Sequence, residues 1–133
     1  MDRWFEMYPI RKGLNVHWAY WIKGGIFLRN DSAINLSPLQ YREFAKPYDT
    51  KLLDYYGGGA IHYCGKGDHF VSEMASIPSL TGINLSQPHL NDMEKICSSA
   101  IPNGKKLLGL KKGACEAYAK RPDAVPGMIY GAD

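Results

Sequence analysis

A histidine and a cysteine lie two residues apart, at His62 and Cys64, where a short apolar run over residues 60–63 gives way to glycine. On an extended segment, side chains at this spacing point to the same side. Imidazole nitrogen and thiolate sulfur are ligands that zinc prefers, and a catalytic zinc keeps one position open, so one further protein ligand would complete a site. The alternative is that Cys64 is a small buried hydrophobe beside a histidine bonded to a backbone carbonyl.

Other polar residues follow the neighbouring apolar runs. Asp31 ends a predicted strand over residues 25–31, and Ser86 and Gln87 lie at the end of a later one. In parallel α/β folds, the reactive groups gather at the carboxyl ends of the strands. We therefore predict that Asp31 orients a substrate or a metal and that Ser86 and Gln87 contact the substrate. His89, in the loop that follows, is a further candidate for substrate contact.

Three residues of similar chemical type are assigned to the fold rather than to a site. His69 falls at the start of a predicted helix and is expected to face solvent. Cys97 and Cys115 fall on predicted helices, where free cysteine behaves as a small core residue. The glycines Gly65 and Gly67 are explained by a tight turn between strand and helix, with anion binding as the alternative.

The best-defined predicted helix begins at Ser37 and the proline that follows it. Serine can cap a helix, and proline suits the first helical position because its missing N–H would be unpaired there. Pro47 is expected to kink or break this helix, and Gly57 to end it. A single apolar face is predicted from residues at helical spacing, namely Tyr41, Phe44, Ala45, Tyr48 and Leu52.

The rest of the chain alternates between short apolar strands and helices. Asp68 can cap one helix, and Asn91 with Glu94 resembles a capping box before another. Strands separated by helices of this length cannot be hairpins, so they pair in parallel with right-handed crossovers. We predict an α/β fold of parallel βα units with four or five strands. The predicted elements are strands at 25–31, 60–63, 83–86 and 106–110, a short helix at 114–120 and a last apolar run at 128–130.

The composition is that of a soluble globular domain. Of 133 residues, 45% are hydrophobic and 22% charged, and the formal net charge of +3 forms no basic stripe, so we expect no nucleic-acid partner. No apolar run approaches the roughly 18 residues that span a bilayer, so we expect no membrane partner. The cysteine count is odd and charges interrupt the N-terminal stretch, so a cytoplasmic location is expected. Lys105 and Lys106 are expected at the solvated end of a strand.

A Ser-Pro helix start and a His-x-Cys-Gly strand end occur within three segments, LRNDSAINLSPLQYREFAKPYDTKLL, GGGAIHYCGKGDHF and INLSQPHLNDMEKI. Together these segments resemble the C-terminal half of the uroporphyrinogen decarboxylase (URO-D) superfamily, over about residues 24–110. The resemblance implies that residues 1–133 are part of a (β/α)8 barrel. The superfamily holds haem-pathway decarboxylases and zinc-dependent methyltransferases that move methyl groups to or from corrinoid proteins and thiols.

For the site, the resemblance implies zinc and favours the methyltransferase branch. His62 and Cys64 are similar to the first two zinc ligands of that branch. Its further ligand is a cysteine near the last barrel strand, and residues 128–133 contain none. Asp31 stands about where the decarboxylase branch has a substrate-binding serine. The implied small molecule is a corrinoid or a tetrapyrrole, with a corrinoid as the methyl donor.

The length of the chain leaves several functional alternatives. A complete barrel takes about 250 residues, so we expect the C-terminal portion of an enzyme, completed by an N-terminal half or by a second chain. Zinc-thiolate methyl transfer is the expected chemistry, with porphyrinogen decarboxylation as the alternative. The chain alone is expected to be inactive, and a truncated, non-catalytic half-barrel is a further alternative. The last alternative is that the chain is a small α/β binding module unrelated to this superfamily.

Overall fold

The protein is built around one parallel sheet, in a computed structural model that describes residues 2–7, 13–17, 20–110, 120 and 129–131. Five strands run in sequence order, β3-β4-β5-β6-β7, and every neighbouring pair is parallel. The predicted α/β fold with parallel βα units is therefore confirmed. The strands are β3 (Ile26–Arg29), β4 (Gly59–Tyr63), β5 (Leu80–Leu85), β6 (Lys106–Leu110) and β7 (Ile129–Gly131).

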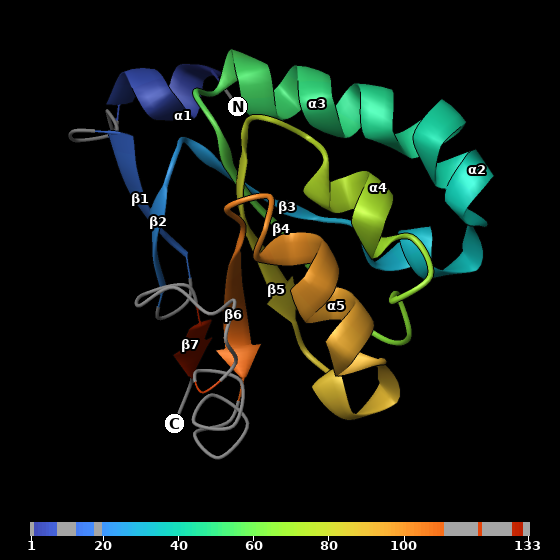
Figure 1. Cartoon of the computed structure of the whole chain (residues 1–133). Helices are drawn as coiled ribbons and strands as arrows, with labels where there is room; N and C mark the ends of the chain where they lie inside the picture. Colours follow the sequence, from blue (N-terminus) through green and yellow to red (C-terminus); the bar gives the residue numbers. More distant parts are fainter. Residues whose placement is uncertain (1, 8–12, 18–19, 111–119, 121–128, 132–133) are drawn as a thin grey trace.

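Helices cover one face of this sheet, and a β-hairpin lies against the other (Figure 1). The hairpin strands β1 (Leu14–His17) and β2 (Tyr20–Lys23) pair antiparallel, and β2 contacts β4 and β5. Ile22 of the hairpin packs with Ala60 and Leu108 of the sheet. The remaining elements are α1 (Asp2–Met7), the 3₁₀ helices η2 (Asp31–Asn35) and η4 (Pro88–Leu90), α2 (Pro38–Gln40), the π-helical turn η3 (Tyr41–Ala45), α3 (Lys46–Tyr55), α4 (Val71–Ala75) and α5 (Met93–Ala100).

The last part of the chain is described only in pieces. The predicted helix over 114–120, with Cys115, lies outside the described residues except for its final position. The apolar run predicted at 128–130 overlaps β7. No helix within the described ranges is long and apolar enough to cross a bilayer.

Alternation along the central strands divides their side chains between the two layers. Ile61 and Tyr63 of β4 belong to the main core beneath the helices. Ala60 points to the opposite side of β4 and packs with the hairpin. His62, two residues further on, points to the same side as Ala60. The strand register places Asn84 of β5 directly beside His62. His62 and Asn84 therefore lie on the face of the sheet opposite the helices.

The long helical segment after β3 is interrupted by the π-helical turn η3, just before Pro47. The N–H of Lys46 donates to the carbonyl of Tyr41, five residues back instead of four. Proline has no N–H to donate, and its ring crowds the carbonyl four residues earlier, so a regular ladder cannot pass through it. The regular helix is thus interrupted just before Pro47, where a kink or break was predicted, and Pro47 lies in the first turn of α3. Gly57, with a φ of +73°, follows the end of α3 as expected.

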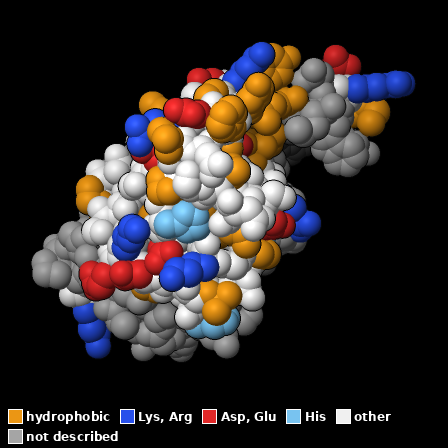
Figure 2. All heavy atoms as spheres, turned by 90° about the vertical axis from the view of Figure 1, so that its right-hand side faces the viewer, with side chains coloured by type: hydrophobic (Ala, Val, Ile, Leu, Met, Phe, Trp, Pro, Cys, Tyr) orange, Lys and Arg blue, Asp and Glu red, His pale blue; other side chains and the backbone are white. Residues whose placement is uncertain are grey.

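The extra residue in η3 turns the following helix by about 100° and changes which side chains reach the core. Tyr41 and Ala45 contact the core as predicted, but beyond them Asp49 and Leu53 are the buried residues. The predicted apolar face was right at Tyr41 and Ala45 and wrong at its other three positions. Its remaining members are exposed, with hydrophobic side chains gathered over α3 at the top of the molecule (Figure 2). They are Phe44 (65% exposed), Tyr48 (69%) and Leu52 (39%).

The same change of register carries a carboxylate into the core. Asp49 Oδ2 accepts hydrogen bonds from Tyr41 OH and Asn30 Nδ2, each at 2.8 Å. Burial raises the pKa of Asp49, and the two hydrogen bonds offset this only in part. Burial also raises the pKa of the Tyr41 hydroxyl. Because Asn30 directly precedes Asp31, this network fixes the corner of the chain that holds a predicted site residue.

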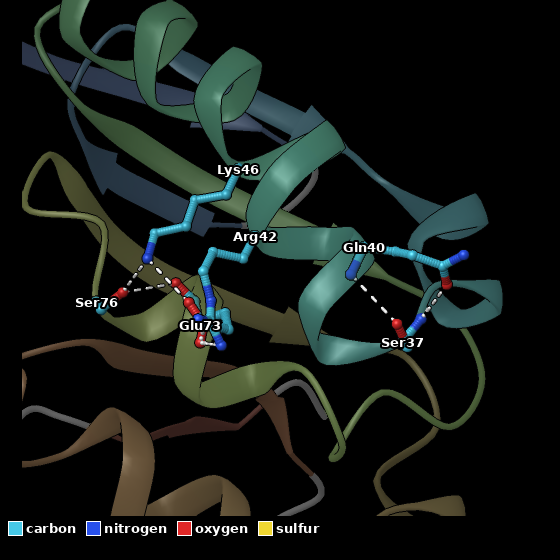
Figure 3. Close-up of polar contacts among 6 residues, drawn as sticks. All are labelled: Ser37, Gln40, Arg42, Lys46, Glu73 and Ser76. Carbon is cyan, nitrogen blue, oxygen red and sulfur yellow. Dashed lines mark hydrogen bonds and ion pairs between the residues drawn. The ribbon is translucent and has the colours of Figure 1, made fainter.

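Polar contacts cap α2 and tie the same segment to α4 (Figure 3). Ser37 Oγ accepts from Gln40 N at 3.2 Å, and Gln40 Oε1 accepts from Ser37 N at 2.8 Å, so the predicted cap is confirmed. Arg42 and Lys46 each reach the Glu73 carboxylate at 3.1 Å. Burial alone would raise the pKa of Glu73, but the hydrogen bonds and charges of Lys46 and Arg42 outweigh it and lower the pKa.

Lys105 departs from the expectation of a solvated strand end. Its side chain is buried, and Nζ donates to the carbonyls of Ile77 at 2.7 Å, Leu80 at 2.8 Å and Pro78 at 3.3 Å. Desolvation lowers the pKa of this ammonium. The prediction was wrong because three carbonyls in the turn before β5 and at its first residue replace water as acceptors. Lys106 is exposed, as expected.

Candidate metal centre

The end of β4 brings an imidazole and a thiol together. His62 is buried and Cys64 half-buried, and His62 Nε2 lies 3.2 Å from Cys64 Sγ. The two side chains therefore point to the same side, as their spacing predicted. The alternative, a cysteine buried as a small hydrophobe beside a histidine bonded to a backbone carbonyl, does not describe this geometry, because the histidine nitrogen meets the sulfur itself.

Asp31 joins this pair from the neighbouring strand. It is the first residue of η2, just after β3, and its Oδ1 lies 3.4 Å from His62 Nε2. The same oxygen accepts a hydrogen bond from Cys64 N at 2.9 Å, which holds the carboxylate against the end of β4. The side chain is 51% exposed, so solvent reaches this side of the cluster. The sequence prediction made Asp31 the last residue of the strand, but β3 already ends at Arg29.

Ser86 completes the group from the next strand. It follows β5, and its Oγ lies 3.4 Å from His62 Nε2 and 3.5 Å from Cys64 Sγ. Three adjacent strand ends thus direct a carboxylate, a thiol and a hydroxyl toward one imidazole nitrogen. This is the edge of the sheet at which the sequence placed these residues, and the structure brings Asp31, His62, Cys64 and Ser86 together there.

Asn84 is a member of the site that the sequence analysis missed. It is buried, its Oδ1 lies 2.5 Å from His62 Nδ1, and its Nδ2 donates to the Leu108 carbonyl at 3.1 Å. A signal was present, because Asn84 precedes Ser86 by two residues on a predicted strand and must share its face. A polar residue within an otherwise apolar strand therefore indicated a further member of the site.

Gln87 and Asn91 join the two loops beside the cluster. Gln87 Oε1 accepts from Gly65 N at 2.8 Å, so the carbonyl end of a predicted substrate-binding side chain is already bonded within the protein. Asn91 Oδ1 accepts from Gly67 N at 2.7 Å, and its Nδ2 donates to the carbonyls of Gly65 and Gln87, both at 2.9 Å. The amides of both turn glycines are thereby committed to the neighbouring loop, which supports the tight-turn interpretation over an anion site.

Two predicted helix caps prove wrong at this edge. Asp92, not Asn91, caps α5, and its side chain accepts from the amides of Glu94 and Lys95. Asp68 does not cap α4, which begins after Phe70; instead it accepts from Asp92 N at 3.1 Å. Both mispredicted residues instead bond across the two loops.

Among the described residues, His69, His89 and Cys97 lie outside the grouped ligand atoms. His89 is exposed on η4 and is not among the grouped ligand atoms. Its predicted contact with substrate stays a prediction. His69 is half-buried, not fully solvated, and its ring nitrogen lies 2.9 Å from the Leu36 carbonyl. Cys97 is buried in α5, as expected.

The cluster has the donor set of a zinc site, and the two separations measured from the imidazole nitrogen are close to those of a tetrahedral one. Bonds of about 2.0 Å to nitrogen or oxygen and 2.3 Å to sulfur, at tetrahedral angles, separate ligand atoms by roughly 3.3–3.5 Å. The observed separations from His62 Nε2 are 3.2 Å to Cys64 Sγ and 3.4 Å to Asp31 Oδ1. All three ligand atoms lie within 4.8 Å of one another. The residues present therefore fit zinc with three protein ligands and one open position.

No protein-family model, no curated protein and no solved structure matches the chain. The fold and the site therefore rest on the residues of the chain itself. They define an α/β protein whose parallel sheet carries a candidate three-ligand metal centre at the carboxyl edge of its strands.

Proposed function

We propose that the chain is the zinc-binding, C-terminal portion of an enzyme resembling the URO-D superfamily, with methyltransferase-type chemistry. The observation that carries the proposal is the convergence of Asp31, His62 and Cys64, whose ligand atoms lie within 4.8 Å of one another. The methyltransferases that the chain resembles take a further cysteine from near the last barrel strand, and residues 128–133 contain none. Asp31 supplies a third ligand from the first strand of the sheet instead.

The donor set favours methyl transfer over the decarboxylase alternative. The groups that surround His62 Nε2 are a thiol, a carboxylate and a hydroxyl, from Cys64, Asp31 and Ser86. Such groups attract a cation and would repel the carboxylates of a porphyrinogen. They therefore suit a metal ion better than a polyanionic tetrapyrrole.

In the proposed reaction the substrate is a thiol that binds at the open position of the metal. Zinc, when bound, would lower the pKa of this thiol, so that its sulfur is a thiolate near neutral pH. His62 and Cys64 would hold the metal from one strand, and Asp31 from the next. Ser86 Oγ, beside both the nitrogen and the sulfur, is placed to donate a hydrogen bond to the substrate. The substrate sulfur would form a bond to the methyl carbon of a methyl-corrinoid, and the electrons of the broken carbon–cobalt bond would stay on cobalt.

The strand order supports the half-barrel part of the proposal. A doubly wound sheet reverses its strand order and takes helices on both faces. Here the order follows the sequence from β3 to β7, and α3, α4 and α5 lie on one face (Figure 1). Right-handed crossovers that always return to the same side are the pattern from which a (β/α)8 barrel is built.

Zinc stoichiometry tests the metal centre. After loading and gel filtration, the chain should retain one zinc, measured by plasma mass spectrometry. Cys64→Ser should lose it, because a hydroxyl is a poor zinc ligand. Cys97→Ala is the matched control, since that cysteine is buried in α5 away from the cluster. A native chain without zinc, or a Cys64→Ser chain that keeps it, would contradict the proposal.

A transfer assay tests the chemistry separately. The completed, zinc-loaded enzyme is mixed with methylcobalamin and a small thiol, and loss of the methylcobalamin spectrum is followed. We expect the enzyme to accelerate this loss and Cys64→Ser to abolish the acceleration. Zinc binding without transfer in the completed enzyme would reject methyl transfer and leave the metal centre standing.

A metal-free cysteine nucleophile is a rival that the same residues raise. Cys64, His62 and Asn84 are bonded in series, an arrangement that also occurs in thiol hydrolases. Acyl transfer needs backbone amides directed at the developing oxyanion. The amide of Cys64 donates to Asp31 and that of Gly65 donates to Gln87, so neither is directed at a substrate. This geometry favours the metal.

A second candidate is a non-catalytic half-barrel that acts only with another chain. Among the described strands, β3 and β7 end the sheet and do not pair with each other. Val16 and Trp21 lie opposite one another in the hairpin and are both exposed, as is Leu14. A covering partner would bury this apolar face and pair the strand edges. This candidate would be rejected if the isolated chain sediments as a monomer and the same preparation transfers methyl groups.

A further inference from the structure

The polar core of the sheet contains an amide that links a backbone carbonyl to the candidate metal ligand. Asn84 is only 4% exposed, so its amide has no alternative partner in water. Its Nδ2 donates to the Leu108 carbonyl of β6 at 3.1 Å, and its Oδ1 lies 2.5 Å from His62 Nδ1. Three neighbouring strands are thus connected in series, from β6 through β5 to β4.

These contacts fix which way the amide points. A backbone carbonyl only accepts hydrogen bonds, so the nitrogen of Asn84 must face Leu108 and the oxygen must face His62. An amide oxygen also only accepts, and the proton between it and the ring must therefore reside on His62 Nδ1. The other ring nitrogen, Nε2, is left to bind through its lone pair, and it faces Cys64 and Asp31.

A glycine in β6 makes the space that this arrangement needs. Gly109 has a φ of +87°, and the pairing of β6 with β7 shifts register there. A Cβ atom at this position would lie 2.6 Å from Asn84 Nδ2. Any larger residue at position 109 would therefore displace the amide that bonds to Leu108.

We propose that Asn84 is a positioning residue, which sets the Nδ1–H tautomer of His62 and presents Nε2 to the metal. Its effect on metal affinity rests on the proposed function, whereas its effect on the tautomer does not. Hydrogen bonds to the second nitrogen of a histidine ligand fix the ring and raise its basicity, and their loss costs about 10–100-fold in metal affinity.

The tautomer is measured by long-range proton–nitrogen NMR on the metal-free chain, under mildly alkaline conditions. The native chain should show the Nδ1–H form of His62, and Asn84→Leu should shift it toward the Nε2–H form. Asn84→Asp keeps an acceptor oxygen at this position and should show the same Nδ1–H form as the native chain. An Nε2–H tautomer in the native chain would overturn the proposal, and this measurement needs no variant to fold.

Zinc affinity is then measured by competition with a chromophoric chelator. Asn84→Leu should weaken binding by about 10–100-fold, and Asn84→Asp should recover it, which a merely structural role would not predict. If the native chain binds no zinc but shows the Nδ1–H tautomer, the proposed function fails and the role of Asn84 in setting the tautomer stands. If zinc binds and Asn84→Leu changes neither the tautomer nor the affinity, the inference about Asn84 fails.

Discussion

Two adjacent leucines in α3 respond differently to truncation if the π-helical turn sets the register of that helix. Leu53 is 0% exposed and Leu52 is 39% exposed. An uninterrupted helix from Ser37 would place Leu52 on the same face as Tyr41 and move Leu53 outward. Leu52→Ala and Leu53→Ala remove the same atoms from neighbouring positions, so each serves as the control for the other.

The expected difference follows from burial. Truncating a fully buried leucine costs about 2–5 kcal/mol, because apolar contacts are lost and a cavity remains. We expect about 3 kcal/mol for Leu53→Ala. Leu52 is partly solvated and leaves no enclosed cavity, so we expect about 1 kcal/mol. For a chain of this size, a difference of about 2 kcal/mol corresponds to roughly 6–10 °C in Tm.

Urea unfolding followed by circular dichroism gives the two free energies, and a thermal scan gives the two Tm values. Equal costs, or a larger cost for Leu52→Ala, would show that η3 does not shift the helical register. That result would also remove the reason for Asp49 to lie in the core, and with it the anchor of Asn30 beside the candidate site.

Two further predictions concern buried charged groups. The pKa of Asp49 is raised by burial, so its contribution to stability is largest below its unfolded-state pKa of about 4 and is lost as pH rises through the folded-state value. Asp49→Asn should therefore gain stability over the native chain as pH rises above about 4, and urea unfolding at a series of pH values that shows a constant difference would contradict this. Lys105→Met should cost about 2–3 kcal/mol, because it leaves buried carbonyls such as that of Ile77 without a donor. Lys106→Met on the exposed neighbour should change stability by less than about 0.5 kcal/mol, and equal losses for the two lysines by the same assay would refute the reasoning.

The sequence predicted those features that depend on local patterns. Alternating strands and helices indicated a parallel α/β sheet, and the two-residue spacing of His62 and Cys64 indicated that their side chains share a side. The cap at Ser37 could be predicted because its partner, Gln40, lies within one helical turn. Asp31 could be placed near the site because the carboxyl ends of adjacent parallel strands meet at one edge.

The features that were missed depend on partners far apart in the sequence. Asn84 bonds to His62 and Leu108, which are 22 and 24 residues away, so no local pattern identifies the contact. Lys105 is buried because carbonyls 25–28 residues away accept its protons. The register of α3 was mispredicted for a different reason, since a period of 3.6 residues assumes an unbroken ladder and Pro47 replaces one turn with a wider one.

The coordination shell of bound zinc tests the central claim most directly. X-ray absorption at the zinc edge of the loaded chain should show one sulfur at about 2.3 Å, from Cys64. It should also show two or three nitrogen or oxygen neighbours at about 2.0–2.2 Å, with the multiple scattering of a single imidazole, from His62. A shell with two sulfurs, a shell with no sulfur, or a chain that retains no zinc would contradict a metal centre made by Asp31, His62 and Cys64.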